Sequence, residues 1–414
     1  MMKWNQIFSD RAKEMKASEI RELLKLTQKP GLISFAGGLP NPQAFPIDAT
    51  RKIINGLLDD SGENVLQYGS TEGINPLRDE LAKMMSNRGM EVDREDILIT
   101  HGSQQALDLL SKVLLNPGDT IIVGSPTYLG ATGAFRAFQA RMESVEVKET
   151  GMDMDKLDKK VEELKKRDRK PKFVYLVPTF QNPSGSTIPA ENRKRLIEIA
   201  EKHDILIVED SPYSHLRYEG KEMPHLISID DDDRVFRLET FSKILAPGFR
   251  IAWCTGPSEL IDKMVIAKQA TDLCTNPFGQ HVAYKYISEG IIYEHIEKIK
   301  KLYNKKRKTM LDAMEDHFPE EARWNKPQGG MFIWAILPEN INTRDMFEKA
   351  ISKKVAYVVG DAFYVDDKGY NTMRLNFTHS SEEEIKEGIE RLSRVIKDEM
   401  KRKKEEPKER LITP

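Results

Sequence analysis

The chain has 414 residues, 39% of them hydrophobic and 31% charged, which is enough apolar material for a large core under a charged surface and long enough for two domains. Its 64 lysines and arginines against 66 aspartates and glutamates give a net charge of −2, which argues against nucleic acid or an anionic membrane as the main partner. Two cysteines, Cys254 and Cys274, exclude a disulfide framework.

The first residues lack the apolar run of a signal peptide, and no stretch of roughly 18 apolar residues occurs, so a soluble cytoplasmic protein is expected. The Lys- and Glu-rich composition fits the ion-pair networks of a heat-adapted protein.

The N-terminal region is predicted to hold one helix followed by an irregular stretch. The helix covers residues 18–27, is capped by Ser18 and stops at Pro30-Gly31. The irregular segment that follows is the glycine-rich "SFAGGLPNPQAFP".

From about residue 50 to about residue 290, helices and apolar strands alternate. Helices are expected from Asn75-Pro76 to Gly89 and from near Ser103. The continuous apolar runs are typical of strands covered on both faces: "DILIT", "DTIIVG", "KFVYLVP", "DILIVED" and "RVFRLET". This alternation predicts an α/β fold with a mostly parallel central sheet wrapped by helices.

The C-terminal part changes its order of elements. One long helix over residues 292–318 precedes "GMFIWAIL", a helix from about Thr343, "MRLNF" and a last helix from Ser381, which together predict a smaller α+β domain. The predicted division is a substrate-covering N-terminal segment over 1–49 that packs with the small domain, a large domain over 50–295 and a small domain over 296–414.

The common nucleotide and zinc motifs are absent from the sequence. There is no G-x-G, no G-x-x-x-x-G-K-[ST] and no H-E-x-x-H, and the eight histidines are scattered, so no metal site is predicted.

Polar residues instead gather at successive strand ends, where ligands bind in such sheets. "THGSQQAL" places Gly102 and Ser103 at a helix start, whose free N–H groups can hold a phosphate, although an ordinary capped helix has the same pattern. Asn182 follows one strand in a turn, and Asp210 ends the next, where a buried carboxylate needs a partner such as an N-cap or a cationic ring nitrogen.

The stretch "TFSKILAPGFR" adds Lys243 to hydroxyl groups and a permanent cation. Lysine is a nucleophile only when its pKa is depressed or when it is committed to a Schiff base. Thr240, Ser242 and Arg250 suit a phosphate. The strand ends together describe a pocket for one phosphate, one ring nitrogen and one aldehyde, which is the requirement set of pyridoxal 5'-phosphate (PLP).

Over essentially its whole length the sequence resembles the fold-type I, class I/II PLP-dependent aminotransferases. The motifs that carry the resemblance are "GGLP", "YGSTEG", "GSQQALDL", "QNPSG", "EDSPY", "TFSK" with Arg250 seven residues on, and "MRLNF". The likeness is nearest to the subgroup of 2-aminoadipate, kynurenine and aromatic amino acid aminotransferases.

The resemblance implies a role for each of these residues at the cofactor ring. Lys243 is expected to hold the cofactor covalently and to move the substrate proton, and Asp210 to pair with the ring nitrogen. Asn182 and Tyr213 are expected to hydrogen-bond the ring hydroxyl, and Tyr128 to stack on the ring.

It also implies a phosphate site, a dimer and a substrate site. The expected phosphate ligands are Gly102, Ser103, Gln104, Thr240, Ser242 and Arg250. Tyr68 is expected to reach the phosphate of the neighbouring subunit, which predicts a homodimer with shared active sites. Arg374 would bind the substrate α-carboxylate bidentately beside Asn182 and Gly38, and Ser18 and Arg21 would cover the side-chain pocket.

The predicted reaction is ping-pong transfer of the amino group of aromatic amino acids, with kynurenine, to 2-oxoglutarate. Two substrate alternatives stay open: 2-aminoadipate of lysine metabolism, and a broad range that includes leucine and methionine. The rival functions are another PLP reaction, a transcriptional regulator and a plain α/β scaffold. Arg374 disfavours another PLP reaction. The absence of an added DNA-binding module ahead of the Ser18 region disfavours a regulator, and Lys243 disfavours a plain scaffold.

Overall fold

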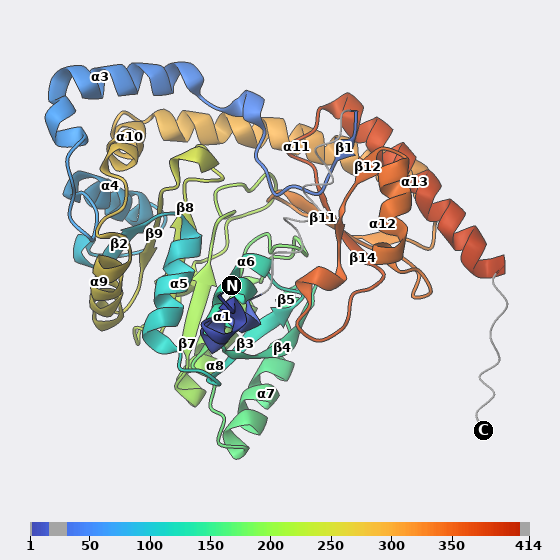
Figure 1. Cartoon of the computed structure of the whole chain (residues 1–414). Coiled ribbons are helices and arrows are strands. Elements are labelled where there is room, and N and C mark those ends of the chain that lie inside the picture. The colour runs from blue at the N-terminus through green and yellow to red at the C-terminus, as the bar shows by residue number, and fades with distance from the viewer. Residues whose placement is uncertain (1, 16–30, 406–414) are drawn as a thin grey trace.

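The computed structural model describes residues 2–15 and 31–405. An eight-stranded sheet in the order β2-β9-β8-β7-β6-β3-β4-β5 forms the centre of the larger part (Figure 1). Strands β8, β7, β6, β3 and β4 are mutually parallel, whereas β9 is antiparallel to both of its neighbours and β5 is antiparallel to β4. The strands are β2 (Ile97–Thr100), β3 (Thr120–Ser125), β4 (Arg141–Lys148), β5 (Gly151–Met152), β6 (Phe173–Leu176), β7 (Leu206–Asp210), β8 (Val235–Thr240) and β9 (Ala252–Thr255). The predicted mostly parallel sheet is confirmed.

Helices cover both faces of this sheet because its strands are apolar on both sides. Ile122, Val174 and Ile207 share one core cluster with α7 and α8, while Val123 and Val208, one residue further on, share another with α5, α6 and α9. Helices α3, α4 and α10 cover the outer face of β2 and β9. The helices are α3 (Ile47–Val65), α4 (Asn75–Ser86), α5 (Ser103–Leu114), α6 (Leu129–Ala137), α7 (Met154–Lys166), α8 (Ala190–His203), α9 (Ser258–Asp272) and α10 (Pro277–Ser288).

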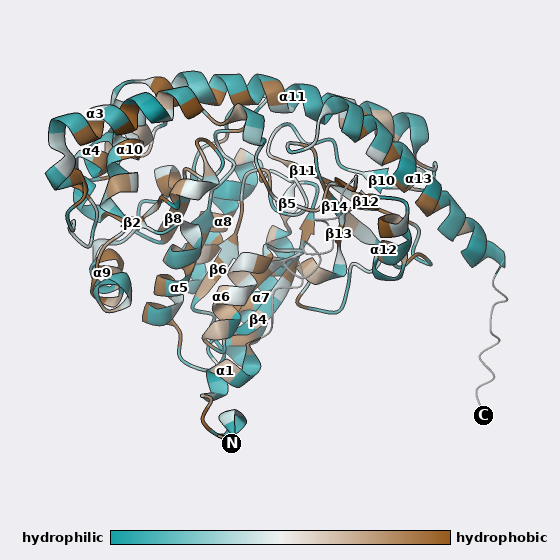
Figure 2. Ribbon diagram, turned by 45° about the horizontal axis from the view of Figure 1, so that its top comes forward, coloured by the Kyte–Doolittle hydropathy of each residue, from teal (hydrophilic) through white to brown (hydrophobic). Residues whose placement is uncertain are grey.

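The smaller part is built on a four-stranded antiparallel sheet in the order β10-β11-β14-β13. Helix α11 runs from the larger part along the top of the molecule in Figure 1, and α13 packs against it. Figure 2 shows hydrophilic residues dominating the visible side of α11. The elements are α11 (Ile291–His317), β10 (Arg323–Trp324), β11 (Phe332–Ile336), α12 (Thr343–Ser352), β12 (Val355–Ala356), β13 (Val358–Val359), β14 (Thr372–Asn376) and α13 (Glu382–Glu405).

The predicted C-terminal helices are confirmed within a residue or two. Ser381 explains the start of α13, since its Oγ accepts from the Glu384 N–H at 3.2 Å and its own N–H donates to the Glu384 carboxylate at 2.7 Å.

Part of the N-terminal region forms a separate two-stranded sheet with the smaller part. Strand β1 (Ile33–Ser34) pairs in parallel with β12, whereas the predicted helix over residues 18–27 lies outside the described residues. A short helix that the sequence did not predict, α1 (Asp10–Glu14), precedes it. The domain boundaries stay a prediction. Over the described ranges, no helix combines the length and the apolar character that a membrane crossing needs.

Candidate active site

The carboxyl ends of the parallel strands bring the predicted polar residues to one edge of the sheet. Asp210 is the last residue of β7, and Thr240 is the last residue of β8. Asn182 lies in the loop after β6, and Ser103 opens α5 just after β2. Strands β6, β7 and β8 are parallel neighbours, so their ends meet in space although 58 residues of sequence separate Asn182 from Thr240.

Asp210 is a buried carboxyl group with one unpartnered oxygen. Its Oδ2 accepts a hydrogen bond from the Tyr175 hydroxyl at 2.7 Å, while Oδ1 has no partner in the part of the chain that the structure describes. Burial raises the pKa of Asp210 to about 7, although the Tyr175 hydrogen bond and the Arg237 charge both lower it. A cationic N–H that faced Oδ1 would supply the counter-charge that the buried carboxylate needs, and would therefore favour its ionised form.

Lys243 lies in the segment after β8 and reaches the N-terminal region of the chain. Its Nζ donates to the Gly38 carbonyl at 2.8 Å. Burial, helped by the positive charges of Arg374 and Arg250, lowers the pKa of Lys243 to about 8. The amine is thus partly neutral near physiological pH, which a nucleophilic lysine requires.

A turn before α5 and the Arg250 side chain form a compact group of hydrogen-bond donors. Gly102 has a φ of 74°, and a Cβ on it would lie 2.3 Å from Arg250 Nη2, so only glycine lets the guanidinium approach. Ser103 Oγ is buried without a partner. Thr240 Oγ1 and Ser242 Oγ are 3.0 Å apart, and Arg250 Nη1 lies 3.5 Å from Ser242 Oγ.

Gln104 belongs to the same helix start through its backbone. Its side chain turns away, since Nε2 donates to the Gly130 carbonyl at 2.8 Å.

Arg374, on β14, is a buried arginine without a carboxylate partner among the described residues. Its Nη1 donates to Asn182 Oδ1 at 2.8 Å and its Nη2 to the Ala36 carbonyl at 2.9 Å, and Nε is unpartnered. The guanidinium carbon lies 4.2 Å from the Phe332 ring centroid and 5.1 Å from that of Phe363. Burial lowers its pKa to about 10. A buried cation in this state suits an incoming carboxylate.

Asn182 joins Arg374 to Tyr213. Its Nδ2 donates to the Tyr213 hydroxyl at 3.3 Å, and the Tyr213 ring meets Phe332 edge to face with centroids 5.8 Å apart. Burial, followed by the nearby Tyr128, raises the pKa of Tyr213. Tyr128 itself is the N-cap residue of α6.

One predicted residue is not brought into this group: Tyr68 is 79% exposed and lies in the segment between α3 and α4. The predicted substrate residues Ser18 and Arg21 lie outside the described residues.

Sequence reasoning missed Tyr175 and Phe332. Both stand in apolar runs whose pattern predicts only a strand. A tyrosine hydroxyl within a buried strand needs a hydrogen-bond partner, which is the available signal for Tyr175.

The unmet needs of these residues fit PLP. Among the described residues, Asp210 Oδ1 and Ser103 Oγ lack hydrogen-bond partners, and the Lys243 amine donates to the neutral Gly38 carbonyl. These are partners for a ring N–H, a phosphate and an aldehyde respectively.

The model of the family "Aminotransferase class I and II" matches residues 39–392. The chain belongs to the class I and II aminotransferases. It is 48% identical over 400 residues to aromatic-amino-acid aminotransferase 1 of Thermococcus litoralis, with 96% of each chain covered. It therefore is a PLP-dependent enzyme that acts on amino acids and 2-oxo acids.

Two solved aminotransferases are similar over nearly the whole chain. The kynurenine aminotransferase of Pyrococcus horikoshii, in complex with PMP, is 48% identical with a TM-score of 0.93 over 96% of this chain and 98% of that one. LysN, the α-aminoadipate aminotransferase of Thermus thermophilus, complexed with N-(5'-phosphopyridoxyl)-L-leucine, is 37% identical with a TM-score of 0.89 over 97% and 100%.

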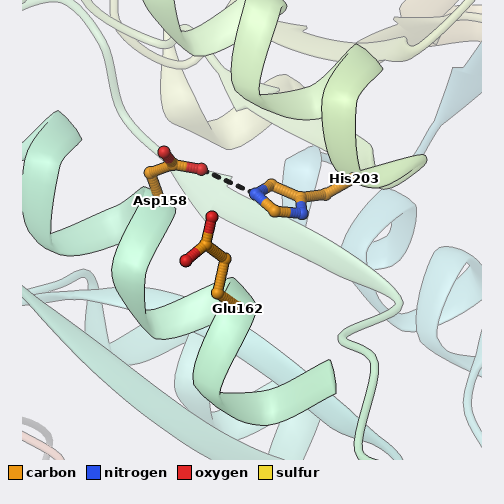
Figure 3. A group of neighbouring side chains, drawn as sticks. All are labelled: Asp158, Glu162 and His203. Atoms are coloured by element: carbon orange, nitrogen blue, oxygen red, sulfur yellow. Dashed lines mark hydrogen bonds and ion pairs between the residues drawn. The ribbon is translucent and has the colours of Figure 1, made fainter. Parts of the chain in front are cut away.

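One cluster far from this site has the composition of a metal centre. Asp158, Glu162 and His203 bring their side chains together between α7 and α8 (Figure 3). Lys202 Nζ, however, donates to both Asp158 oxygens and to Glu162, each at 2.9 Å. Because this ammonium group already binds both carboxylates, we read the cluster as an ion-pair network between the two helices and assign it no metal.

Proposed function

We propose that this aminotransferase transfers the amino group of aromatic amino acids, kynurenine included, to 2-oxoglutarate by a ping-pong mechanism. The observation that best supports this function is the state of Arg374. It is a buried cation that donates to Asn182 and to the Ala36 carbonyl and has no acidic partner in the described residues. Both amino acids that exchange through the pocket would bring it a carboxylate. The aromatic preference is supported by the names of the relatives from Thermococcus litoralis and Pyrococcus horikoshii.

The proposal gives Lys243 and Asp210 the central roles. Bound PLP supplies an electron sink that stabilises negative charge at the substrate Cα. Lys243 Nζ would hold the cofactor through its aldehyde and would carry a proton to and from the substrate Cα. Asp210 keeps the ring nitrogen protonated through its free Oδ1. Asn182 and Tyr213 hold the ring hydroxyl, and Tyr128 covers the ring face.

The phosphate is proposed to bind where the donors gather. The N–H groups at the start of α5 and the Arg250 guanidinium would face it, since the helix start carries positive partial charge. The proposed protein ligands are Gly102, Ser103, Gln104, Thr240, Ser242 and Arg250. Tyr68, 79% exposed in the single chain, is proposed to complete the phosphate site of a second subunit in a homodimer.

The substrate end is proposed to consist of Arg374, Asn182 and the Gly38 backbone. The planar guanidinium would bind the α-carboxylate bidentately, with the Gly38 backbone beside it. Arg21 is the proposed partner of a distal carboxylate, and Ser18 lies near it in sequence. A cytoplasmic location stays a prediction.

A second candidate, 2-aminoadipate, is favoured by the similarity to LysN, and a broad range including leucine and methionine is the further alternative. The test is kcat/KM with 2-oxoglutarate for phenylalanine, tyrosine, kynurenine, 2-aminoadipate, leucine and methionine. Highest values for the aromatic donors are expected. A higher value for 2-aminoadipate would replace the first candidate by the second.

Arg21→Ala sharpens this test. It is expected to depress activity on 2-oxoglutarate and 2-aminoadipate more than on phenylalanine or tyrosine, and equal losses on all four would remove Arg21 from the pocket.

A further inference from the structure

A buried charge cluster lies on the opposite face of the sheet from the candidate active site. Along a strand, neighbouring side chains point to opposite faces. Asp210 and Thr240 face the site, so the residues just before them, Glu209 and Glu239, point to the other side. Both are buried, with exposed fractions of 0% and 2%.

Arg237 joins the ends of the two strands on that face. Its Nη1 lies 2.6 Å from Glu209 Oε1 and its Nη2 2.7 Å from Glu239 Oε1, and its Nε donates to the same Glu239 oxygen at 2.8 Å. Nη1 also lies 3.0 Å from Ser211 Oγ. One guanidinium thus contacts the residues on both sides of Asp210 and the residue before Thr240.

The position of this contact matters because the ladder between β7 and β8 ends there. Asp210 pairs with Leu238, and the last backbone bond runs from the Ser211 N–H to the Leu238 carbonyl at 2.9 Å. Beyond this bond the two segments are no longer paired: the one after β7 leads to Tyr213, and the one after β8 leads to Lys243. The Arg237 contacts are therefore the cross-link nearest to the point of separation.

The surrounding groups carry charges of both signs. Burial lowers the pKa of both nearby histidines, which favours their neutral form. Arg88 Nη1 lies 3.7 Å from Glu239 Oε2 and is hydrogen-bonded to His215 Nε2 at 2.8 Å. The charged and titratable groups are Arg88, Arg193, Arg217, Arg237, Glu209, Glu222, Glu239, His215 and His225.

We propose that Arg237 is a positioning residue for the cofactor, which fixes the carboxylate that faces the ring nitrogen relative to the segment that carries the phosphate hydroxyls and Lys243. The inference rests on the proposed roles of Asp210 and Lys243. A buried ion pair adds little net stability compared with apolar side chains of similar volume. The planar guanidinium of Arg237 can instead fix the relative positions of the groups that it contacts.

The test compares Arg237→Lys with a matched control, Arg78→Lys. Arg78 is also buried, at 7% exposed, and its fork binds the carbonyls of Ile97 and Arg94 at the opposite edge of the sheet. Both variants keep the charge and lose the fork. Arg237→Lys is expected to raise the Kd for PLP about tenfold or more, the loss typical of removing an outer hydrogen-bonded support, whereas Arg78→Lys leaves it within about twofold.

Two further readouts separate positioning from general damage. With saturating cofactor, Arg237→Lys should lower kcat about tenfold while KM for the aromatic donor changes less than about threefold, because Arg374 and Asn182 are untouched. The pH midpoint of the bound cofactor's visible absorbance should also move by about half a unit or more.

A second variant serves if Arg237→Lys does not fold. Arg237→Met and Glu239→Gln together remove one charge of each sign at similar volume, and they leave Glu209 facing Arg193 and Arg88 paired with Glu222. It should show the same loss of PLP affinity. Wild-type Kd and kcat in the folded variant, or an equal loss in Arg78→Lys, would overturn the proposal. Failure of the wild-type protein to bind PLP would instead overturn the proposed function.

Discussion

Asp210 and Arg374 are buried and Lys243 is half-buried, and among the described residues none of the three has the counter-charge that it would normally need. Within the same residues Asp210 Oδ1 and Arg374 Nε have no hydrogen-bond partner, and Lys243 Nζ donates to a neutral carbonyl. Each group carries a pKa shifted by burial toward its neutral form. A ligand that brings a cation, an aldehyde and a carboxylate relieves all three.

Arg374→Ala should leave PLP binding intact and lower kcat/KM by about two orders of magnitude or more, because a desolvated bidentate carboxylate contact is worth roughly 3 kcal/mol. The measurement is steady-state kinetics at saturating PLP, with the absorbance of the bound cofactor as a control. A loss below tenfold with the cofactor fully bound would contradict the α-carboxylate role.

Asp210→Asn should stabilise the cofactor-free protein while weakening PLP binding. The folded carboxyl has its pKa raised from 3.8 to about 7 by burial, so the folded protein holds a proton that the unfolded chain releases. Stability from this group is present below about pH 4 and is lost as pH rises toward 7, a loss on the order of 4 kcal/mol at pH 8.

The measurement is Tm without PLP at pH 5 and pH 8. The excess Tm of Asp210→Asn over wild type should grow between the two values, and added PLP should raise the variant's Tm less than that of wild type. A lower Tm for the variant at pH 8 would show that the carboxylate already has a counter-charge.

At the scale of elements, the turn between β2 and α5 depends on one glycine. Gly102→Ala places a methyl group 2.3 Å from Arg250 Nη2 at a φ of 74°. Gly89 has a φ of 75°, and a methyl carbon added to it would have no atom within 4 Å. Gly89→Ala is therefore a matched control that carries the backbone strain without the collision.

Gly102→Ala should therefore weaken PLP binding about tenfold or more, measured as a Kd by titration of the cofactor-free protein, while Gly89→Ala lowers Tm with an unchanged Kd. If both variants bound PLP equally well, the turn and Arg250 would not form the phosphate site.

The apolar runs predicted five strands of the central sheet correctly, because those strands are buried on both faces. The long helices were predicted from an apolar side that packs in the core and a charged side that faces outward. Three strands of the eight-stranded sheet were not predicted, namely β4, β9 and the two-residue β5. Strand β4, "RMESVEVK", is largely exposed or half-buried and carries charges, so it has no continuous apolar run. Strand β9 has four residues after a turn, and its antiparallel direction follows from the fold around it.

Most site residues could be predicted because they lie in short motifs at strand ends. Their partners could not, since those depend on register and on distant segments. The Tyr175 hydroxyl meets Asp210 only because β6 and β7 pair side by side, and Lys243 meets Gly38 across 205 positions of sequence. Arg237 stands in a run whose pattern predicts only a strand, and its buried role appears only in three dimensions.

At the scale of the whole molecule, the proposed dimer makes Tyr68 a residue of the other subunit's site. Tyr68→Ala should reduce PLP affinity, and Lys243→Ala should lack turnover. In mixed dimers, one of the two sites joins an intact Tyr68 to an intact Lys243.

Refolding the two variants together should thus restore activity at limiting PLP to about a quarter of wild type, since about half of the dimers are mixed and each has one complete site. Each variant alone, refolded in the same way, is the control. Activity no greater than the sum of the two controls would place Tyr68 outside the shared site.

The covalent attachment of PLP to Lys243 tests the account most directly. The purified protein with PLP is treated with borohydride, digested, and its peptides are mapped by mass spectrometry, with Lys243→Ala as the control. A pyridoxyl adduct is expected on Lys243 alone, with none in the variant. An adduct on a different lysine, or no adduct in a protein that binds PLP, would contradict it.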